Sequence, residues 1–302
     1  MKLTFKSLLL GSAIAISAMS SLSSAAFAAE KIKAVASFSI LGDMVSRVGG
    51  DLVEVTTIVG PNSDTHVYEP KPADAQSVVA TQVFFVNGLG FEGWMERLVE
   101  STGYKGITVV ASDGVKSRTM MEDGAEETDP HAWQNLSNGL IYVKNIADGL
   151  CKVDATDCDA FRKNAEAYSV EISALDADIK AKIAAVPEAK RKVITTHDAF
   201  GYFGAAYGVA FMAPEGMSTE SEASAADVAK LIEQIRKDGV TALFVENMSD
   251  PRLLEQIAKE TGVKVGGELY ADALSEKTEP GATYLAMFRH NISLLAPAMA
   301  GS

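Results

Sequence analysis

Short apolar runs alternate with amphipathic stretches along most of the chain. Runs such as 33–38, 83–86 and 242–245 have the continuous apolar character of strands that are buried on both faces. Stretches such as 40–48 and 225–237 carry apolar residues at steps of three and four, as amphipathic helices do. This alternation of strand and helix predicts an α/β fold with mostly parallel sheets.

One amphipathic stretch, 159–185, is much longer than the others and ends before Pro187. As a helix it would span about 40 Å, which suits a strut between two lobes better than an element of one lobe. Its expected buried stripe consists of Phe161, Ala165, Tyr168, Ile172, Leu175, Ile179 and Ile183.

Because strand–helix units occur on both sides of this helix, we expect two Rossmann-like lobes joined by one long rigid helix. A chain of this length is also longer than a single hydrophobic core usually supports. The expected division is a signal peptide at 1–29, an N-terminal lobe at 30–158, the linking helix at 159–187 and a C-terminal lobe at 188–302.

The first 29 residues have the pattern of a secretory signal peptide. Lys2 and Lys6 precede an apolar run at 8–19, and Ala26-Phe27-Ala28 provides small residues at the cleavage positions. The run is short for a membrane span. Since no cysteine stands at the cleavage point, we expect a soluble periplasmic protein that is neither inserted in a membrane nor lipid-anchored.

The formal net charge of −13 argues against nucleic acid or an anionic membrane as a partner. It is compatible with a protein that collects cations, although many soluble proteins are acidic. We expect the protein to act as a monomer.

The chain has two cysteines, Cys151 and Cys158. In an oxidising compartment, two thiols this close in sequence most simply form a local disulfide. A thiolate metal pair is less favoured, because the intervening loop lacks histidine and the spacing is wider than in common metal motifs.

Three of the four histidines lie in turn-like segments that follow apolar runs. Ligands of open parallel sheets bind beyond the carboxyl ends of strands, so these segments can converge. One aspartate in a similar position completes a set of three nitrogens and one oxygen, which suits a four-coordinate zinc ion. The candidate ligands are His66, His131, His197 and Asp272.

Each candidate also has a simpler interpretation. A single histidine in a loop is more often a surface residue or a helix cap, and Asp272 alone would be read as a turn or N-cap residue. The hypothesis therefore depends on the joint placement of the four residues. His290 lies within the predicted C-terminal helix, where we expect a structural role.

Together these segments resemble the solute-binding proteins of zinc and manganese ABC importers, and the resemblance covers essentially the whole mature chain. It rests on four ligand segments and two stretches further downstream: 65–70, 129–133, 196–203, 269–275, 281–284 and 289–291.

The resemblance implies a high-affinity zinc-binding protein, not an enzyme, that delivers Zn²⁺ to the permease of an ABC importer. A periplasmic metallochaperone is a further possible partner. It also implies that His66, His131, His197 and Asp272 are the metal ligands. Manganese members tend to carry a carboxylate where this chain has His197, so Mn²⁺ is less favoured than Zn²⁺.

Segment 114–128 departs from the family pattern. Many zinc members have a long histidine-rich loop between the first two ligands, whereas this segment is short, acidic and free of histidine. We interpret it as a surface loop without strong periodicity.

Other functions stay open at this stage. A manganese-binding homologue and a metal-binding adhesin would share the fold. A secreted zinc hydrolase would need a general base, for which Asp198, Glu69 or Glu246 are candidates, and an open coordination position. No His-Glu-x-x-His motif is present, and four protein ligands would leave no open position.

Overall fold

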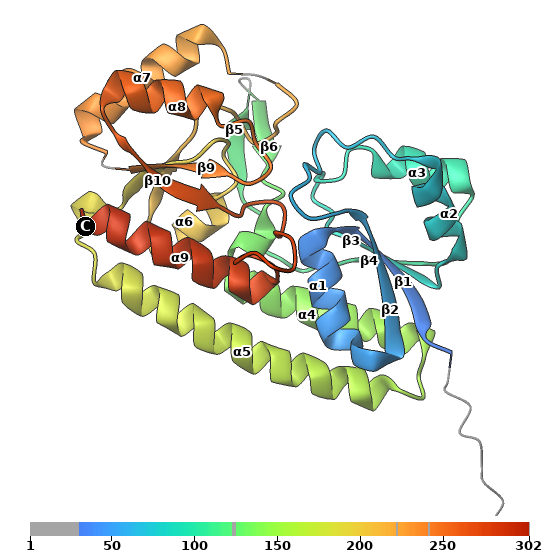
Figure 1. Ribbon diagram of the computed structural model, residues 1–302. Coiled ribbons are helices and arrows are strands. Elements are labelled where there is room, and N and C mark those ends of the chain that lie inside the picture. Colours follow the sequence, from blue (N-terminus) through green and yellow to red (C-terminus); the bar gives the residue numbers. More distant parts are fainter. Residues whose placement is uncertain (1–29, 123–124, 222, 241, 302) are drawn as a thin grey trace, which may run out of the picture. The chain divides into compact units, whose positions relative to one another are not determined.

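The computed structural model describes residues 30–301 except for 123–124, 222 and 241 (Figure 1). The expected signal peptide at 1–29 therefore lies outside the described residues. Within them, residues 31–301 belong to one compact unit. Its regular elements are two four-stranded sheets, a separate pair of strands and the helices that cover the sheets.

The first sheet is entirely parallel and has the strand order β2-β1-β3-β4. Its inner strand β3 is short and apolar and is buried at every position. Helices α1 and α4 pack against the sheet. The elements of this lobe are β1 (Ile32–Phe38), α1 (Ser39–Gly49), β2 (Val53–Val59), α2 (Pro72–Ala80), β3 (Val83–Val86), α3 (Met95–Thr102), β4 (Ile107–Val110) and α4 (Leu136–Val153).

The second sheet is also parallel, with the order β10-β9-β7-β8. The two parallel sheets confirm the predicted α/β fold with two lobes. The elements of the second lobe are β7 (Lys192–Ile194), α6 (Gly201–Tyr207), β8 (Ala210–Met212), α7 (Ala225–Asp238), β9 (Ala242–Glu246), α8 (Arg252–Thr261), β10 (Lys264–Leu269) and α9 (Tyr284–Ala300).

Two strands of the second sheet differ from the sequence prediction. The sequence does not indicate the short strand β8. The apolar pattern at 263–265 predicts a further strand, but β10 continues to Leu269. Gly266 and Gly267 suggest a strand end in the sequence, but here they lie at a register shift between β10 and β9. Gly267 has a φ of 130°, and a Cβ there would contact the Leu294 side chain at 3.0 Å.

The long helix predicted from periodicity is α5 (Cys158–Ala184), with 27 residues. Its buried positions are the seven of the predicted stripe. It contacts α1 and α4 of the first lobe and α9 of the second, so one helix serves both lobes (Figure 1). The main hydrophobic core includes residues of both lobes and of α5. The exact division into domains stays a prediction.

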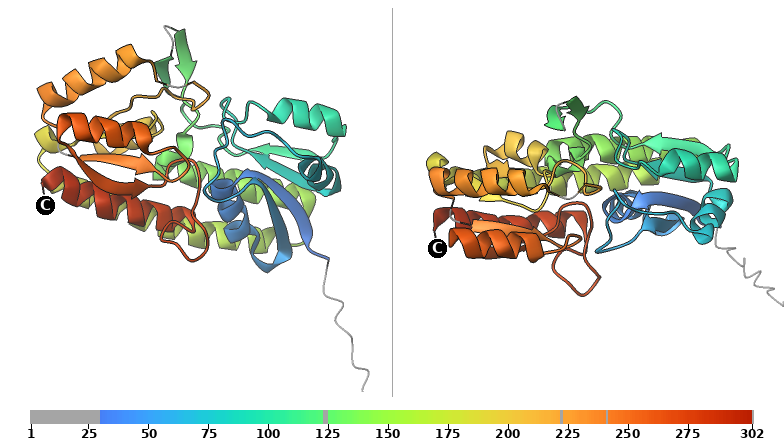
Figure 2. Two further views of the ribbon diagram at one scale, coloured as in Figure 1. Left: turned by 45° about the horizontal axis from the view of Figure 1, so that its top comes forward. Right: turned by 90° about the horizontal axis from the view of Figure 1, so that it is seen from above.

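Segment 114–128 contains regular structure that the sequence did not indicate. Strands β5 (Thr119–Glu122) and β6 (Ala125–Thr128) pair in antiparallel register, with Thr119 opposite Thr128 (Figure 2). The interpretation as a surface loop therefore missed this pair of strands, although β6 is exposed at most of its positions. Backbone pairing across the short strands orders a sequence that has little hydrophobic pattern of its own.

Cys151 and Cys158 form the predicted disulfide. The bond joins the last turns of α4 to the first residue of α5. It therefore fixes the point at which the chain turns from the first lobe into the long helix.

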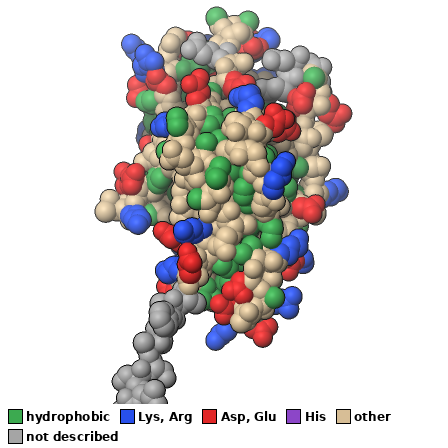
Figure 3. All heavy atoms as spheres, turned by 90° about the vertical axis from the view of Figure 1, so that its right-hand side faces the viewer, with side chains coloured by type: hydrophobic (Ala, Val, Ile, Leu, Met, Phe, Trp, Pro, Cys, Tyr) green, Lys and Arg blue, Asp and Glu red, His purple; other side chains and the backbone are tan. Residues whose placement is uncertain are grey.

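Lysine, arginine, aspartate and glutamate side chains are interspersed on the face shown in Figure 3. The negative net charge is thus not gathered into one patch there. In the part of the chain that the structure describes, no helix combines the length and apolar character needed to cross a membrane.

Asp43 connects the two lobes through the start of a helix. This α1 side chain accepts a hydrogen bond of 2.9 Å from the backbone N–H of Tyr284, the first residue of α9. Burial raises the pKa of Asp43 to about 6, although the Tyr284 N–H and Arg47 favour the ionised form. The folded protein therefore binds a proton here more tightly than the unfolded chain does.

We predict that Asp43→Asn removes a pH-dependent loss of stability. Because the folded pKa is raised, the contribution from Asp43 is fully present below its unfolded value of 3.8 and is lost as the pH rises through about 6. A rise of the pKa from 3.8 to about 6 corresponds to about 3 kcal/mol, so urea unfolding should show the variant gaining roughly this much relative to the wild type between acidic and neutral pH. The exposed Asp51→Asn change should show no such trend, and equal trends in both variants would contradict the assignment.

Candidate metal centre

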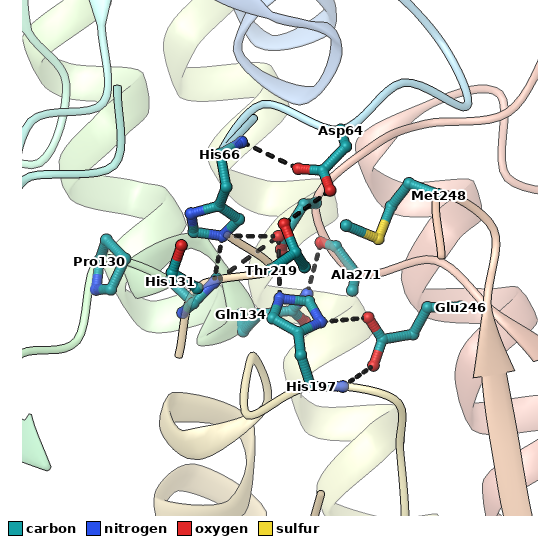
Figure 4. Close-up of polar contacts among 12 residues, drawn as sticks. Asp64, His66, Pro130, His131, Gln134, His197, Thr219, Glu246, Met248 and Ala271 are labelled. Atoms are coloured by element: carbon teal, nitrogen blue, oxygen red, sulfur yellow. Dashed lines mark hydrogen bonds and ion pairs between the residues drawn. The ribbon is translucent and has the colours of Figure 1, made fainter. Parts of the chain in front are cut away.

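The four predicted ligands converge in the structure, and their potential ligand atoms all lie within 4.8 Å of one another (Figure 4). Asp272 Oδ2 is the common neighbour of the three histidines. It lies 3.0 Å from His197 Nε2, 3.2 Å from His66 Nε2 and 3.6 Å from His131 Nε2. The Nε2 atoms of His66 and His131 are 3.3 Å apart.

The parallel sheets explain this convergence. His197 and Asp272 are each the third residue after a strand, β7 and β10 respectively, and His66 lies in the loop after β2. All three therefore emerge from the carboxyl ends of strands, where ligand sites of such sheets form. His131 instead follows the hairpin strand β6 and precedes a short 3-10 turn at Ala132–Gln134.

Buried carboxylates orient two of the histidine rings. Asp129 Oδ1 lies 2.9 Å from His131 Nδ1 and also accepts the backbone N–H of His131 at 3.0 Å. Glu246 Oε2 contacts His197 Nδ1, and its Oε1 accepts the backbone N–H of His197 at 3.2 Å. Each carboxylate holds a proton on Nδ1 and leaves the Nε2 lone pair directed at the centre.

Sequence reasoning did not identify this role for Asp129 or Glu246. The sequence indicates Asp129 only as part of the His131 segment and Glu246 only as a candidate general base. Two features of the chain point to this role. Asp129 lies two residues before His131, and Glu246 lies at the end of β9.

The segment that carries Asp272 is held from two sides. The carbonyl oxygen of Ala271 accepts hydrogen bonds from Trp133 Nε1 at 3.0 Å and Gln134 Nε2 at 2.7 Å. On the other side, the Asn291 amide in α9 accepts from the backbone N–H of Tyr270 and donates to its carbonyl oxygen. These contacts fix Asp272 relative to both the His131 segment and α9.

His66 is held differently from the other two histidines. Among the four residues it alone has measurable exposure, 8%, against 0% for the others. Its ring edge packs on Phe91, and its backbone N–H donates to Asp64 Oδ1 at 2.9 Å. It also lines a cavity of about 360 Å³ together with Phe91, Glu127, Pro130, Met217 and Glu220. His66 is thus the histidine on the solvent side of the cluster.

The charges in the cluster depend on one another. Burial opposes a charged His131, but Asp272 and Asp129 raise its pKa to about 9. Burial likewise opposes a charged His197, yet Glu246 and Asp272 hold its pKa well above the usual value. Burial alone would raise the pKa of Asp272, but His131 and His197 hold it well below its usual range. A metal ion at this point would replace the protons as the source of positive charge.

Several buried oxygens near the cluster lack a hydrogen-bond partner among the described residues. Asp272 Oδ1 is one of them, so this carboxylate has a second oxygen that a cation could use. Three more lie beside residues of the cluster. Thr65 Oγ1 and Thr196 Oγ1 belong to the residues before His66 and His197, and Gln134 Oε1 belongs to a side chain that contacts the Asp272 segment. Three imidazole nitrogens and a carboxylate with a spare oxygen fit a transition-metal ion.

His290, the fourth histidine, lies outside this cluster. Its Nε2 lies 2.8 Å from the carbonyl oxygen of Glu268, and its ring packs against Tyr270. Both contacts lie within the second lobe, in keeping with the structural role expected for it.

Two parallel-sheet lobes with a buried cluster of imidazole nitrogens and one carboxylate define a metal-binding protein. The chain belongs to the family described as zinc-uptake complex component A, periplasmic, whose model matches residues 34–298. It is a metal-binding, substrate-binding protein of an ABC transporter, and it works with a permease and an ATPase. The family consists of substrate-binding proteins and not of enzymes.

Relatives of this chain are named for different metals. The iron ABC transporter substrate-binding lipoprotein MtsA of Streptococcus pyogenes is 35% identical over 90% of each chain. The manganese-binding lipoprotein MntA of Halalkalibacterium halodurans is 33% identical over 87% of each chain. The periplasmic zinc binding protein TroA from Treponema pallidum is 29% identical, with a TM-score of 0.85 over 90% of this chain and all of TroA.

The comparisons correct the expected localisation. We expected a protein without a lipid anchor, but MtsA and MntA are both named lipoproteins. The expectation rested on the absence of a cysteine at one predicted cleavage point. That local feature is too narrow a basis for deciding how a mature chain is held at a membrane, and we withdraw the expectation.

Glu246→Gln should weaken metal binding. The amide keeps an acceptor oxygen but loses the charge that holds the His197 ring and supports its basicity. We expect the affinity for a divalent metal to fall by about 10- to 100-fold in competition titrations with a chelator. The exposed Glu268→Gln change in β10 is the matched control and should leave the affinity unaltered. An unchanged affinity in the Glu246 variant would refute the orienting role.

Proposed function

We propose that this protein binds Zn²⁺ as its cargo and delivers it to the permease of an ABC importer. The proposed ligands are His66, His131, His197 and Asp272. The observation that carries the proposal is the burial of three Nε2 atoms around one carboxylate oxygen, within 4.8 Å. Zinc–nitrogen bonds of about 2.0–2.1 Å place the donor atoms of a tetrahedron about 3.3 Å apart. The three distances from Asp272 Oδ2 to the histidine Nε2 atoms and the His66–His131 Nε2 distance, 3.0–3.6 Å, are close to this value.

Manganese is the second candidate metal. One relative is named for manganese, and the spare Asp272 Oδ1 could add the further oxygen that a harder ion prefers. Three imidazoles nevertheless favour zinc in the usual order of affinities. Both metals fit the same transport role, so the choice between them is a matter of measurement.

Delivery requires a route for the ion, and we propose that it runs past His66. The exposed fraction of His66 and its cavity put it between the cluster and solvent. We further propose that the lobes at 30–158 and 188–302 act as the two sides of the site, with 159–187 as the fixed connection. In this arrangement the Asp272 segment stays in place and the His66 segment moves.

Metal-stripped protein should bind Zn²⁺ more tightly than Mn²⁺, on the order of a hundredfold. Competition calorimetry measures this ratio directly.

His131→Ala should lose at least about tenfold in zinc affinity because one buried nitrogen ligand is absent. His290→Ala is the control for losing a histidine and should bind as the wild type does.

Tighter binding of Mn²⁺ than of Zn²⁺ would overturn the zinc assignment and leave the transport role in place. Equal zinc affinity in the His131 and His290 variants would overturn the ligand assignment itself. Cobalt-substituted protein adds an independent check, since its absorption spectrum distinguishes a tetrahedral site from an octahedral one.

Thr219→Val should accelerate metal release. Thr219 Oγ1 donates to Asp64 Oδ2 at 2.7 Å, and Asp64 Oδ1 accepts the backbone N–H of His66, so the hydrogen bond ties the His66 segment to the second lobe. Losing one such bond should raise the release rate by about fivefold in stopped-flow mixing with a chelator. Thr219→Ser keeps the hydroxyl and should release the metal at the wild-type rate. A Thr219→Val rate equal to that of the wild type would show that this hydrogen bond does not retain the ion.

A further inference from the structure

Three carboxylates of the centre are buried. Asp129 and Asp272 are 0% exposed, and Glu246 is 2% exposed. Each contacts a histidine of the cluster, so their negative charges act at short range on whatever occupies it. Asp64 and Asp198 also lie nearby but are partly exposed, so water screens their charges. Buried charges without compensation are costly, so this group requires three positive charges.

Arg118 supplies positive charge at one of these carboxylates. Its Nη1 donates to Asp129 Oδ2 at 3.1 Å, while the other oxygen of Asp129 serves His131. Among the described residues, Arg118 is the one lysine or arginine that forms an ion pair with a buried carboxylate of the centre. Glu246 has no such partner in the same part of the chain.

The guanidinium of Arg118 is held in place by packing. It lies over the ring of Tyr202, 5.7 Å from the ring centroid, and the backbone N–H of Arg118 donates to the Tyr202 hydroxyl at 3.1 Å. Gly201, the first residue of α6, provides the space. A Cβ at Gly201 would lie 1.4 Å from Arg118 Nη1 and 2.8 Å from Asp129 Oδ2. Any side chain at position 201 would therefore displace the guanidinium from Asp129.

The net charge of the occupied site depends on the valence of the bound ion. With neutral imidazoles, three carboxylates balance one divalent ion together with one guanidinium. A trivalent ion in the same place leaves an excess positive charge in a buried site, which is costly. Without the guanidinium the balance reverses, and a trivalent ion matches the three carboxylates by itself.

We infer that Arg118 is a specificity-determining residue that makes the site select divalent over trivalent metal ions. The inference rests on the proposed function, because it requires the ion to occupy the His–Asp cluster. It deepens that function by assigning the choice of valence to a residue that is not a ligand.

The test compares Zn²⁺ with Ga³⁺, a trivalent ion without redox chemistry, on the metal-stripped full chain. Both affinities are measured by competition with nitrilotriacetate. In Arg118→Gln the ratio of zinc to gallium affinity should fall by at least about tenfold relative to the wild type, allowing for the 36% exposure of the Arg118 side chain. Arg118→Lys keeps the charge and should hold the ratio within about threefold of the wild-type value.

Arg47→Gln is the matched control. Arg47 forms an ion pair with Glu171 and lies over the Tyr168 ring, as Arg118 does with Asp129 and Tyr202, but its partners are not ligands or ligand supports. Its removal should not alter the ratio. An unchanged ratio in Arg118→Gln, or an equal fall in Arg47→Gln, would overturn the inference.

A second variant covers the case in which Arg118→Gln does not fold. Gly201→Ala keeps the arginine but displaces its guanidinium, so the ratio should fall in the same direction; no fall would count against the inference. Wild-type protein that fails to bind Zn²⁺ would instead overturn the proposed function. Zinc binding with an unaltered ratio in the variants would overturn only the role of Arg118.

Discussion

The structure depends above all on the burial of one carboxylate, that of Asp272. It is fully enclosed, and its Oδ2 faces the Nε2 atoms of three histidines. An enclosed charge of this kind is tolerable only if positive charge lies within a few ångströms. The loops after β2, β7 and β10 must therefore meet at this carboxylate. The contacts of Ala271 with Trp133 and Gln134 fix the loop after β10 to the His131 segment, and the backbone N–H of Asn62 donates to the Leu274 carbonyl oxygen at 2.9 Å between the loops after β2 and β10.

The three histidines divide into two kinds. His131 and His197 are completely buried and are each supported by a carboxylate at Nδ1, so their rings have little freedom. His66 has measurable exposure and lines a cavity, and its segment reaches the second lobe through Asp64 and Thr219. A transport protein needs both properties, because an ion must be held tightly and must still be able to leave. The asymmetry assigns these properties to different histidines of the cluster.

Features with a local pattern could be predicted from the sequence. The buried stripe of α5, the short apolar strands and the disulfide between Cys151 and Cys158 follow from periodicity or proximity, and all are present. The cluster was predictable because each of its four residues lies in a recognisable segment. The supporting residues were not. Asp129, Glu246 and Gly201 acquire their roles only when distant segments pack together, and the β5–β6 pair has almost no hydrophobic pattern.

The same limit applies to metal identity. Proteins named for iron, manganese and zinc share about a third of their residues with this chain, so the two-lobed fold by itself does not select a metal. Selection must lie in a few atoms: how many nitrogens and oxygens face the ion, whether Asp272 contributes one oxygen or two, and how much charge surrounds the cluster. The number of donor atoms selects metal ions by their preferred coordination geometry, whereas the surrounding charge selects them by their valence. Because Arg118 acts on charge without contacting the ion, the two kinds of selectivity can vary independently on one scaffold.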